Sequence, residues 1–351
     1  MRGGVGGVDG VDGVEHAAVS APSAPGDKPR FGQITFVGIG LINGSLARDV
    51  RRLGLAERLV GTARRRETLD QACALGLVDA ATPDAAAAVR DADLVVLGVP
   101  VGASGAAARA IAPGLRPGAV VTDVGSVKAG VIEQVSPHLD MRRFVPGHPV
   151  AGTENSGPDA AIERLFQGRW CILTPTETTD AEAVDRVAAL WRAVGSRVEL
   201  MEPAHHDKVL AVTSHMPHLL AFNIVNTADG LEDVLKGEIL KYAAGGFTDF
   251  TRIAASDPTM WRDVFLHNKA AVLEVLGCYI EELMALQRAI RWEESDALFG
   301  RFESARAIRR EVVRAGQAYK RIPAADARPT GATQRAERVS ELSVAAECAA
   351  K

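Results

Sequence analysis

Short apolar runs alternate with amphipathic stretches from Gln33 to about Met201. The runs include ITFVGIG, RLVGTA, LVVLGVP, AVVTDVG, WCILTP and RVELM. Continuous apolar runs of this length are typical of strands buried on both faces of a parallel sheet, and the helices between them form right-handed crossovers. The pattern predicts an α/β fold, with a doubly wound Rossmann-type parallel sheet over residues 33–201.

The pattern changes after Pro203, where the remaining apolar residues follow a helical period. We therefore predict an all-helical substrate and dimerisation domain over residues 202–321. Its helices are long and strongly apolar, and a domain of about 120 residues cannot easily bury such surfaces internally. The excess apolar surface predicts a homodimer.

The two ends of the chain have a different composition. Residues 1–32 and 322–351 are rich in Gly, Ala, Ser and Pro, and we predict disordered tails there, with a weak helix over residues 336–350. The first tail lacks the basic cluster and the apolar run of a signal peptide. No run of 18 apolar residues exists, so we predict no membrane span.

Composition narrows the class of protein. An apolar fraction of 47% is enough for a real core, and a net charge of −4 argues against nucleic-acid binding. The four cysteines are far apart and form no CxxC pair, so their spacing does not suggest a disulfide framework or a zinc site. We expect a cytoplasmic enzyme in a reducing compartment.

A glycine-rich turn follows the first predicted strand. Gly38, Gly40 and Gly44 open the next helix, whose backbone amides and dipole can hold a pyrophosphate. A GxGxxG motif would place glycine at position 43, where this chain has Asn43. An ordinary βα turn is the alternative, but the place of the turn in the first βα unit favours dinucleotide binding. We predict cofactor contacts from this turn and from the ends of later strands: Gly38, Gly40, Leu41, Ile42, Gly44, Val99, Pro100, Asp123 and Ser126.

The end of the second strand bears on the choice of cofactor. NAD-binding chains usually carry an acidic residue there for the ribose hydroxyls, whereas this chain has Gly61-Thr-Ala-Arg-Arg-Arg66. Arg64 and Arg65 can instead pair with a 2′-phosphate. A solvated basic start of a helix is the alternative. We predict an NAD(P)+ cofactor and favour NADP over NAD.

One histidine lies between a glycine and a proline. The stretch VPGHPVAG delivers His148 to the carboxyl edge of the sheet, near Ser126 and Lys128 of TDVGSVK. Gly147 and Pro149 are expected to make this segment rigid and irregular, because neither helix nor strand continues easily through it. A histidine that only bonds its own loop is the alternative. The position favours a general base that accepts the proton of a substrate hydroxyl while hydride leaves.

The helical domain carries further candidates. His215 and His218 are three residues apart on one helical face, with Pro217 expected to kink the helix between them. His205, His206 and Asp207 raise the possibility of a metal, but HxxH lacks a third ligand at recognisable spacing, and we predict none.

A pair of glycines breaks the helical pattern further along the chain. The segment after them offers Arg252 and Trp261. A surface charge is the simpler interpretation of Arg252, but its planar fork in an irregular segment suits a carboxylate clamp.

Five motifs in register resemble the prephenate/arogenate dehydrogenase family over about residues 33–320. They are Gly38–Ser45, Asp123–Lys128, Gly147–Glu154, Ser214–His218 and Phe250–Asp263. The resemblance implies oxidative decarboxylation of prephenate to 4-hydroxyphenylpyruvate in tyrosine biosynthesis, or of arogenate to tyrosine. The residues alone indicate a nicotinamide-dependent oxidoreductase with an anionic substrate.

The resemblance also implies roles for individual residues. His148 would take the proton of the ring 4-hydroxyl, Ser126 would orient the hydroxyl and the nicotinamide, and Arg252 would bind a substrate carboxylate. The pocket would be lined by Thr153, Glu154, His215, His218 and Trp261. Two other classes stay open: another hydroxy-acid dehydrogenase with a helical domain, which would typically use a lysine there, and a non-catalytic dinucleotide sensor, which would have no need of His148 and Arg252 together.

Overall fold

The computed structural model describes residues 29–230 and 242–314. The chain divides into two compact units, one up to Tyr279 and one from Ile280 onward, and each is described by itself. The predicted C-terminal tail and its helix over residues 336–350 lie outside the described residues. So does most of the predicted N-terminal tail, and the first strand begins at Phe31, before the predicted start of the domain at Gln33.

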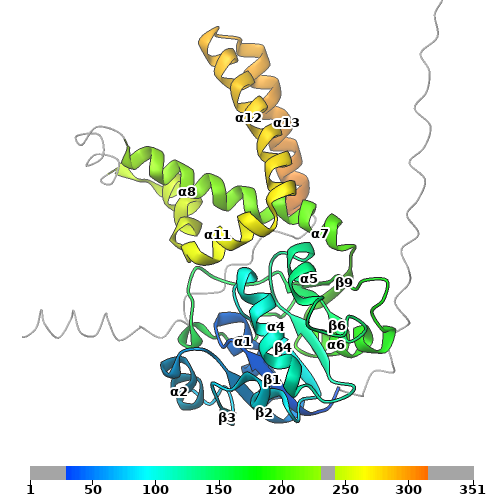
Figure 1. Ribbon diagram of the computed structural model, residues 1–351. Coiled ribbons are helices and arrows are strands. Elements are labelled where there is room, and N and C mark those ends of the chain that lie inside the picture. The colour runs from blue at the N-terminus through cyan, green and yellow to red at the C-terminus, as the bar shows by residue number, and fades with distance from the viewer. Residues whose placement is uncertain (1–28, 231–241, 315–351) are drawn as a thin grey trace, which may run out of the picture. The chain divides into compact units, whose positions relative to one another are not determined.

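The first unit is built on a six-stranded sheet with the order β3-β2-β1-β4-β5-β6 (Figure 1). All neighbouring strands are parallel, with registers such as Val37↔Thr62 and Leu97↔Asp123. This arrangement confirms the predicted doubly wound fold. The strands are β1 (Phe31–Val37), β2 (Ala56–Thr62), β3 (Ala80–Ala81), β4 (Leu94–Leu97), β5 (Val120–Asp123) and β6 (Phe144–Val145).

Helices cover both faces of this sheet because successive residues of each strand face opposite sides. In β4, Leu94 and Val96 pack into one core cluster with α1, α2 and α6, while Val95 and Leu97 pack into a second cluster with α3, α4 and α5. The helices are α1 (Leu41–Leu53), α2 (Arg66–Ala74), α3 (Ala85–Val89), α4 (Ser104–Ile111), α5 (Ala129–Val135) and α6 (Ala181–Ala193), with short 3₁₀ turns η1 (Val101–Ala103), η2 (Ala112–Gly114) and η3 (Pro158–Ala160).

A second sheet holds His148 and differs from the sequence prediction. It contains β7 (Gly147–Pro149), β8 (Trp170–Leu173) and β9 (Arg197–Leu200), with β7 antiparallel to β8 and β8 parallel to β9. We expected an irregular segment around His148, but His148 pairs with Ile172 in a short strand. The strand tolerates Pro149 because β7 lies at the edge of the sheet and Pro149 is its last residue.

The rest of the first unit is helical. It comprises α7 (Pro203–Leu210), the π-helical turn η4 (Ala211–His215), α8 (Met216–Asp229), α10 (Gly245–Thr251), the 3₁₀ turn η5 (Arg252–Ala255), α11 (Pro258–His267) and the start of α12 (Lys269–Arg291). No strand is described after Leu200 in the residues that the structure covers, which confirms the helical prediction.

Two local predictions about these helices need adjustment. The expected kink at Pro217 takes the form of the π-helical turn η4, which ends just before α8, so Pro217 lies in the first turn of α8. The glycines that were expected to break the helical pattern, Gly245 and Gly246, instead begin α10. Glycine is tolerated there because the first turn of a helix has few intrahelical bonds to lose. Arg252 follows directly, in η5.

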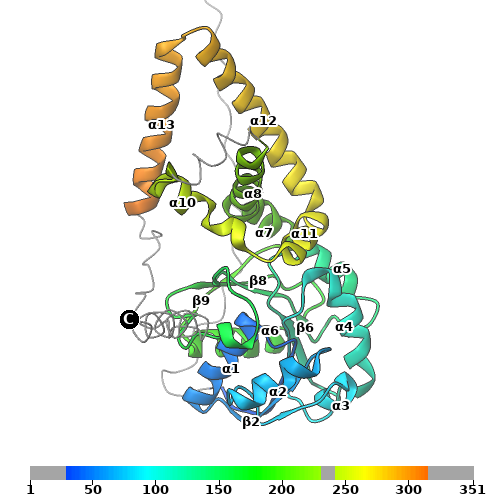
Figure 2. The ribbon, with the colours of Figure 1, turned by 90° about the vertical axis from the view of Figure 1, so that its left-hand side faces the viewer.

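The second unit consists of the end of α12 and α13 (Ser295–Arg314), joined by a short turn (Figure 2). Ion pairs join Arg288 to Glu294 and Arg301 to Glu282. α13 buries none of its side chains, and both helices expose large apolar side chains: Leu283, Met284, Ile290, Phe299, Phe302 and Ile308. None of the helices in the described part of the chain is long and apolar enough to cross a membrane.

Candidate active site

The turn between β1 and α1 has the geometry of an anion-binding site. Gly38 has a φ of +80°, a left-handed conformation that favours glycine. Gly40 precedes α1 without any side-chain cap, and a Cβ on Gly40 would meet open space. Because the first intrahelical bond runs from Gly44 N to Gly40 O, the amides of residues 41–43 have no intrahelical partner. These amides and the open space above Gly40 fit a dinucleotide pyrophosphate.

Asn43 and Gly44 explain why the glycine motif is offset by one residue. The Asn43 side chain is buried and donates from Nδ2 to Gly38 O at 2.7 Å and to Val96 O at 3.2 Å. It therefore ties the start of α1 to the ends of β1 and β4. A Cβ on Gly44 would lie 2.9 Å from that of Ala161, so glycine allows the segment around η3 to pack against α1.

The predicted cofactor residues after β2 and β4 lie at the same edge of the sheet. Arg64 and Arg65 are exposed, and neither has an ion-pair partner among the described residues, whereas Arg66 pairs with Asp70. A Cβ on Gly38 would lie 3.0 Å from Val99 Cγ1, so the β4 loop contacts the glycine turn. Pro100, next along that loop, begins η1. The structure thus brings together the glycine turn and the β4 loop.

Asp123, at the end of β5, is bonded to the protein itself. One carboxylate oxygen accepts from Lys128 Nζ and from Gly125 N, and the other accepts from Gly147 N at 3.1 Å. Lys128 is fully buried and also donates to Gly147 O at 2.7 Å. These bonds hold β7, and with it His148, against the end of β5. A direct contact of Asp123 with the cofactor stays a prediction.

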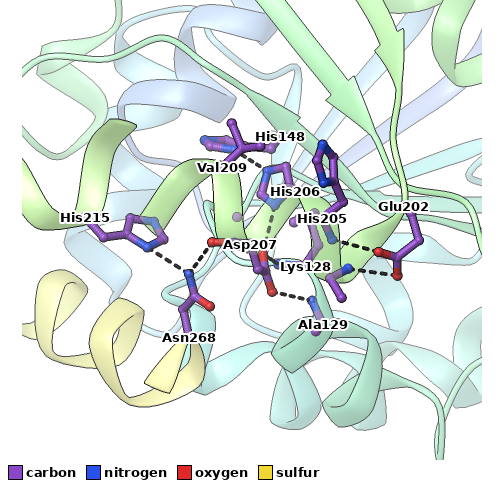
Figure 3. Close-up of polar contacts among 12 residues, drawn as sticks. Lys128, Ala129, His148, Glu202, His205, His206, Asp207, Val209, His215 and Asn268 are labelled. Atoms are coloured by element: carbon purple, nitrogen blue, oxygen red, sulfur yellow. Dashed lines mark hydrogen bonds and ion pairs between the residues drawn. The ribbon is translucent and has the colours of Figure 1, made fainter. Parts of the chain in front are cut away.

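His148 is the first member of a buried chain of polar side chains (Figure 3). Its Nδ1 lies 2.9 Å from His206 Nε2, and His206 Nδ1 lies 2.8 Å from Asp207 Oδ1. The Asp207 carboxylate also accepts backbone N–H bonds from Lys128 and Ala129, at the start of α5. His148 Nε2 makes no hydrogen bond to a described residue and is not among the fully enclosed unpartnered atoms. It is the nitrogen left for a ligand.

Burial keeps the imidazoles of His148 and His206 neutral. Desolvation lowers the pKa of His148 well below its usual 6.5, and the charges of His206, Lys128 and His215 lower it further. Desolvation also lowers the pKa of His206, although the hydrogen bond to Asp207 opposes it. A neutral imidazole can accept a proton, so His148 is in the state that a general base needs.

His215, His218 and Trp261 come together next to His148. The ring of His218 stacks on Trp261 at a centroid distance of 3.7 Å, and His215 meets Trp261 edge-on at 6.0 Å. Asn268 donates from Nδ2 to His215 Nδ1 at 3.0 Å, so His215 Nε2 carries the ring hydrogen. That Nε2 is buried and has no well-formed hydrogen bond. Desolvation lowers the pKa of His215 to about 4.

Ser126 and Arg252 lie beside these histidines. Desolvation lowers the pKa of His215, and the contact with the Ser126 backbone opposes this effect. Desolvation also lowers the pKa of His218, and the charge of Arg252 lowers it further. The guanidinium of Arg252 is half exposed and pairs with Glu154 at 2.8 Å. Thr153, next to Glu154, accepts a hydrogen bond from Asn155 N. A substrate carboxylate would therefore meet Arg252 already paired with a protein carboxylate.

Sequence reasoning missed the roles of four residues in this site. His206 and Asp207 were considered only as metal ligands, Lys128 only as an edge residue, and Asn268 not at all. The residues that the structure describes contain no group of three or more side chains suited to hold a metal. The sequence signal for His206 and Asp207 is weak, because their partners, His148 and the start of α5, lie far from them along the chain.

The glycine turn, the free amides of α1 and a neutral histidine at the same sheet edge are features of nicotinamide-dependent dehydrogenases. Two family models, "Prephenate dehydrogenase, nucleotide-binding domain" and "Prephenate dehydrogenase, dimerization domain", match residues 46–200 and 202–304. The chain belongs to the prephenate dehydrogenase family.

Individual relatives agree with this assignment. The cyclohexadienyl dehydrogenase of Zymomonas mobilis is 42% identical over 280 residues, which cover 80% of this chain and 95% of that protein. The structure of Aquifex aeolicus prephenate dehydrogenase in complex with hydroxyphenyl propionate and NAD+ has a TM-score of 0.75 at 37% identity, covering 80% of this chain and 98% of that one. Synechocystis arogenate dehydrogenase has a TM-score of 0.67 at 31% identity, covering 80% and 99%.

The lowered histidine pKa values predict a loss of stability in mild acid. His215 stays neutral in the folded chain down to about pH 4, whereas in the unfolded chain it takes up a proton near pH 6.5. Stability is therefore highest above pH 6.5 and falls below it, by about 1.4 kcal/mol per pH unit for each such histidine. Urea unfolding between pH 7 and pH 5 measures this slope.

A pair of variants assigns that slope to buried histidines. His215→Gln should lower the slope by about 1.4 kcal/mol per pH unit, the contribution of one histidine. His205→Gln, at an exposed neighbouring histidine, should leave the slope unchanged. A wild-type stability that is the same at pH 7 and pH 5 would show that these histidines are not held neutral.

Proposed function

We propose that this chain catalyses the oxidative decarboxylation of prephenate to 4-hydroxyphenylpyruvate, with hydride transfer to NAD(P)+. The observation that carries the proposal is the buried, neutral His148 beside the dinucleotide turn, with Nε2 left unbonded. A base in that position suits a substrate with a hydroxyl-bearing carbon, where the carbon loses a hydride and the hydroxyl loses its proton. Arogenate, which has an amino group where prephenate has a keto group, undergoes the same chemistry.

The proton of the ring 4-hydroxyl passes to His148 Nε2 as the carbon–hydrogen bond breaks. Bound nicotinamide supplies the acceptor for the hydride. The bond from the ring to its carboxylate then breaks, carbon dioxide leaves, and the electron pair completes the aromatic ring. The new phenolate oxygen recovers the proton from His148, so no net proton is released. We assign the role of orienting the hydroxyl to Ser126, on the loop after β5.

The charged groups around the pocket suit a dianionic substrate. We assign the side-chain carboxylate of the substrate to Arg252. The substrate carboxylate would either replace Glu154 as the partner of the guanidinium or bind to it together with Glu154. His215 holds its Nε2–H beside the Ser126 backbone without a well-formed hydrogen bond, and we assign the stacked rings of His218 and Trp261 to an apolar wall. Thr153, beside Glu154, completes the assigned set. This set is mostly neutral or basic, which favours a substrate with carboxylates.

Three finer assignments are part of the proposal. Arg64 and Arg65, which are exposed and have no ion-pair partner in the described part of the chain, favour NADP over NAD. The apolar side chains exposed on α12 and on the first half of α13, which the dimerization-domain model matches up to residue 304, favour a homodimer. Cys73, Cys171 and Cys278 are free thiols, which suits a reducing cytoplasm.

Replacement of the base tests the proposed reaction. Wild-type protein given prephenate and NADP+ should form NADPH, carbon dioxide and 4-hydroxyphenylpyruvate in equal amounts. His148→Asn should lower kcat by about 100-fold or more with little change in KM, because a general base acts in the transition state. His205→Asn, at an exposed histidine, is the matched control. Wild-type protein that oxidises neither prephenate nor arogenate, or an unchanged kcat in folded His148→Asn, would refute the proposal.

The cofactor assignment has its own test. Replacing both Arg64 and Arg65 by Ala should raise KM for NADP+ by about tenfold or more and leave KM for NAD+ nearly unchanged, because only NADP carries the 2′-phosphate. Arg109→Ala, at an exposed arginine of α4, controls for the loss of surface charge. Equal losses for the two cofactors would remove the assignment.

A further inference from the structure

His206 and Asp207 have no part in the proposed proton and hydride transfer, yet both are almost completely buried. His206 is 0% exposed and Asp207 is 4% exposed. Both lie near the middle of α7, which begins after Glu202. The Glu202 carboxylate caps the helix by accepting from Ala204 N and His205 N. This cap fixes the start of α7, so the helix presents His206 to His148 and Asp207 to the start of α5 (Figure 3).

The donors around Asp207 determine which ring nitrogen of His206 carries the hydrogen. Its carboxylate accepts from the backbone amides of Lys128 at 2.8 Å and Ala129 at 2.9 Å, and an amide can only donate. These two bonds, at the positive end of α5, favour the ionised carboxylate. An ionised carboxylate only accepts, so His206 Nδ1 must be the donor of the 2.8 Å bond to Asp207.

The tautomer of His206 in turn determines the tautomer of His148. Desolvation lowers the pKa of His206, so the ring is neutral and its Nε2 has a lone pair instead of a hydrogen. The 2.9 Å contact is then a bond donated by His148 Nδ1 to His206 Nε2. A neutral His148 with hydrogen on Nδ1 has its lone pair on Nε2, the nitrogen without a protein partner.

We propose that His206 and Asp207 are positioning residues that fix the tautomer of His148, so that Nε2 is always the accepting nitrogen. When His148 takes the substrate proton, its Nδ1–H bond to His206 becomes charge-assisted, and the Asp207 carboxylate stabilises the positive charge through His206. Neither residue touches the substrate. The role in turnover rests on the proposed function, whereas the tautomer of His148 does not.

Two variants at position 206 separate this role from packing. His206→Phe keeps a buried ring but removes both hydrogen bonds. His206→Gln can donate from its amide nitrogen to Asp207 and accept from His148 Nδ1 with its amide oxygen. His205→Phe and His205→Gln are matched controls, because His205 is the exposed neighbour on the same helix.

We expect kcat for prephenate to fall by about 10- to 100-fold in His206→Phe, with KM changed by less than about twofold, and to recover partly in His206→Gln. A purely structural role would not give rescue by Gln with an unchanged KM. A kcat equal to wild type in folded His206→Phe would overturn the inference while leaving the proposed function in place.

A second measurement needs no turnover. Nitrogen-15 spectra of the histidine rings, recorded on wild-type protein with NADP+ bound, distinguish a protonated ring nitrogen from an unprotonated one, and His148→Asn identifies the signals of His148. The inference predicts hydrogen on Nδ1 and none on Nε2. Hydrogen on Nε2 of neutral His148 would overturn it, whether or not the protein oxidises prephenate.

Discussion

The site depends on the carboxylate of Asp207. It accepts three hydrogen bonds, two from the backbone at the start of α5 and one from His206 on its own helix. It therefore fastens α7 to the sheet domain and orients the histidine chain at the same time. A buried carboxylate is costly unless all of its bonds are satisfied, and here both oxygens are bonded to fixed donors. The proton positions of His206 and His148 follow from this one group.

A second buried charge holds His148 from the other side. Lys128 is fully enclosed, pairs with Asp123 and donates to the carbonyl of Gly147, the residue before His148. A buried ion pair is tolerable when further hydrogen bonds complete its coordination, as Gly125 and Gly147 do for Asp123. The positive charge of Lys128 also lowers the pKa of His148. Lys128 thus helps to place the base rigidly and adds to the larger effect of desolvation that keeps it neutral.

The sheet domain and the helical region could be predicted from the sequence because their apolar periodicity is strong, and the glycine turn because glycine positions report backbone geometry directly. The strand at Gly147–Pro149 could not, since a three-residue edge strand leaves no periodic signal. Asn268 and the pair His206–Asp207 were missed for another reason. Their partners lie 53 to 79 residues away in sequence, and only the packing of helices brings them together.

The central claim is that burial and the histidine chain keep His148 neutral, with one nitrogen free to accept a proton. The pH dependence of kcat/KM for prephenate, followed as NADPH formation over the range in which the protein stays folded, tests it most directly because it reports the ionisation of the free enzyme. The account predicts that activity persists as the pH falls below 6.5, since desolvation lowers the pKa of His148 well below that value. An acid limb centred at or above pH 6.5 would contradict it.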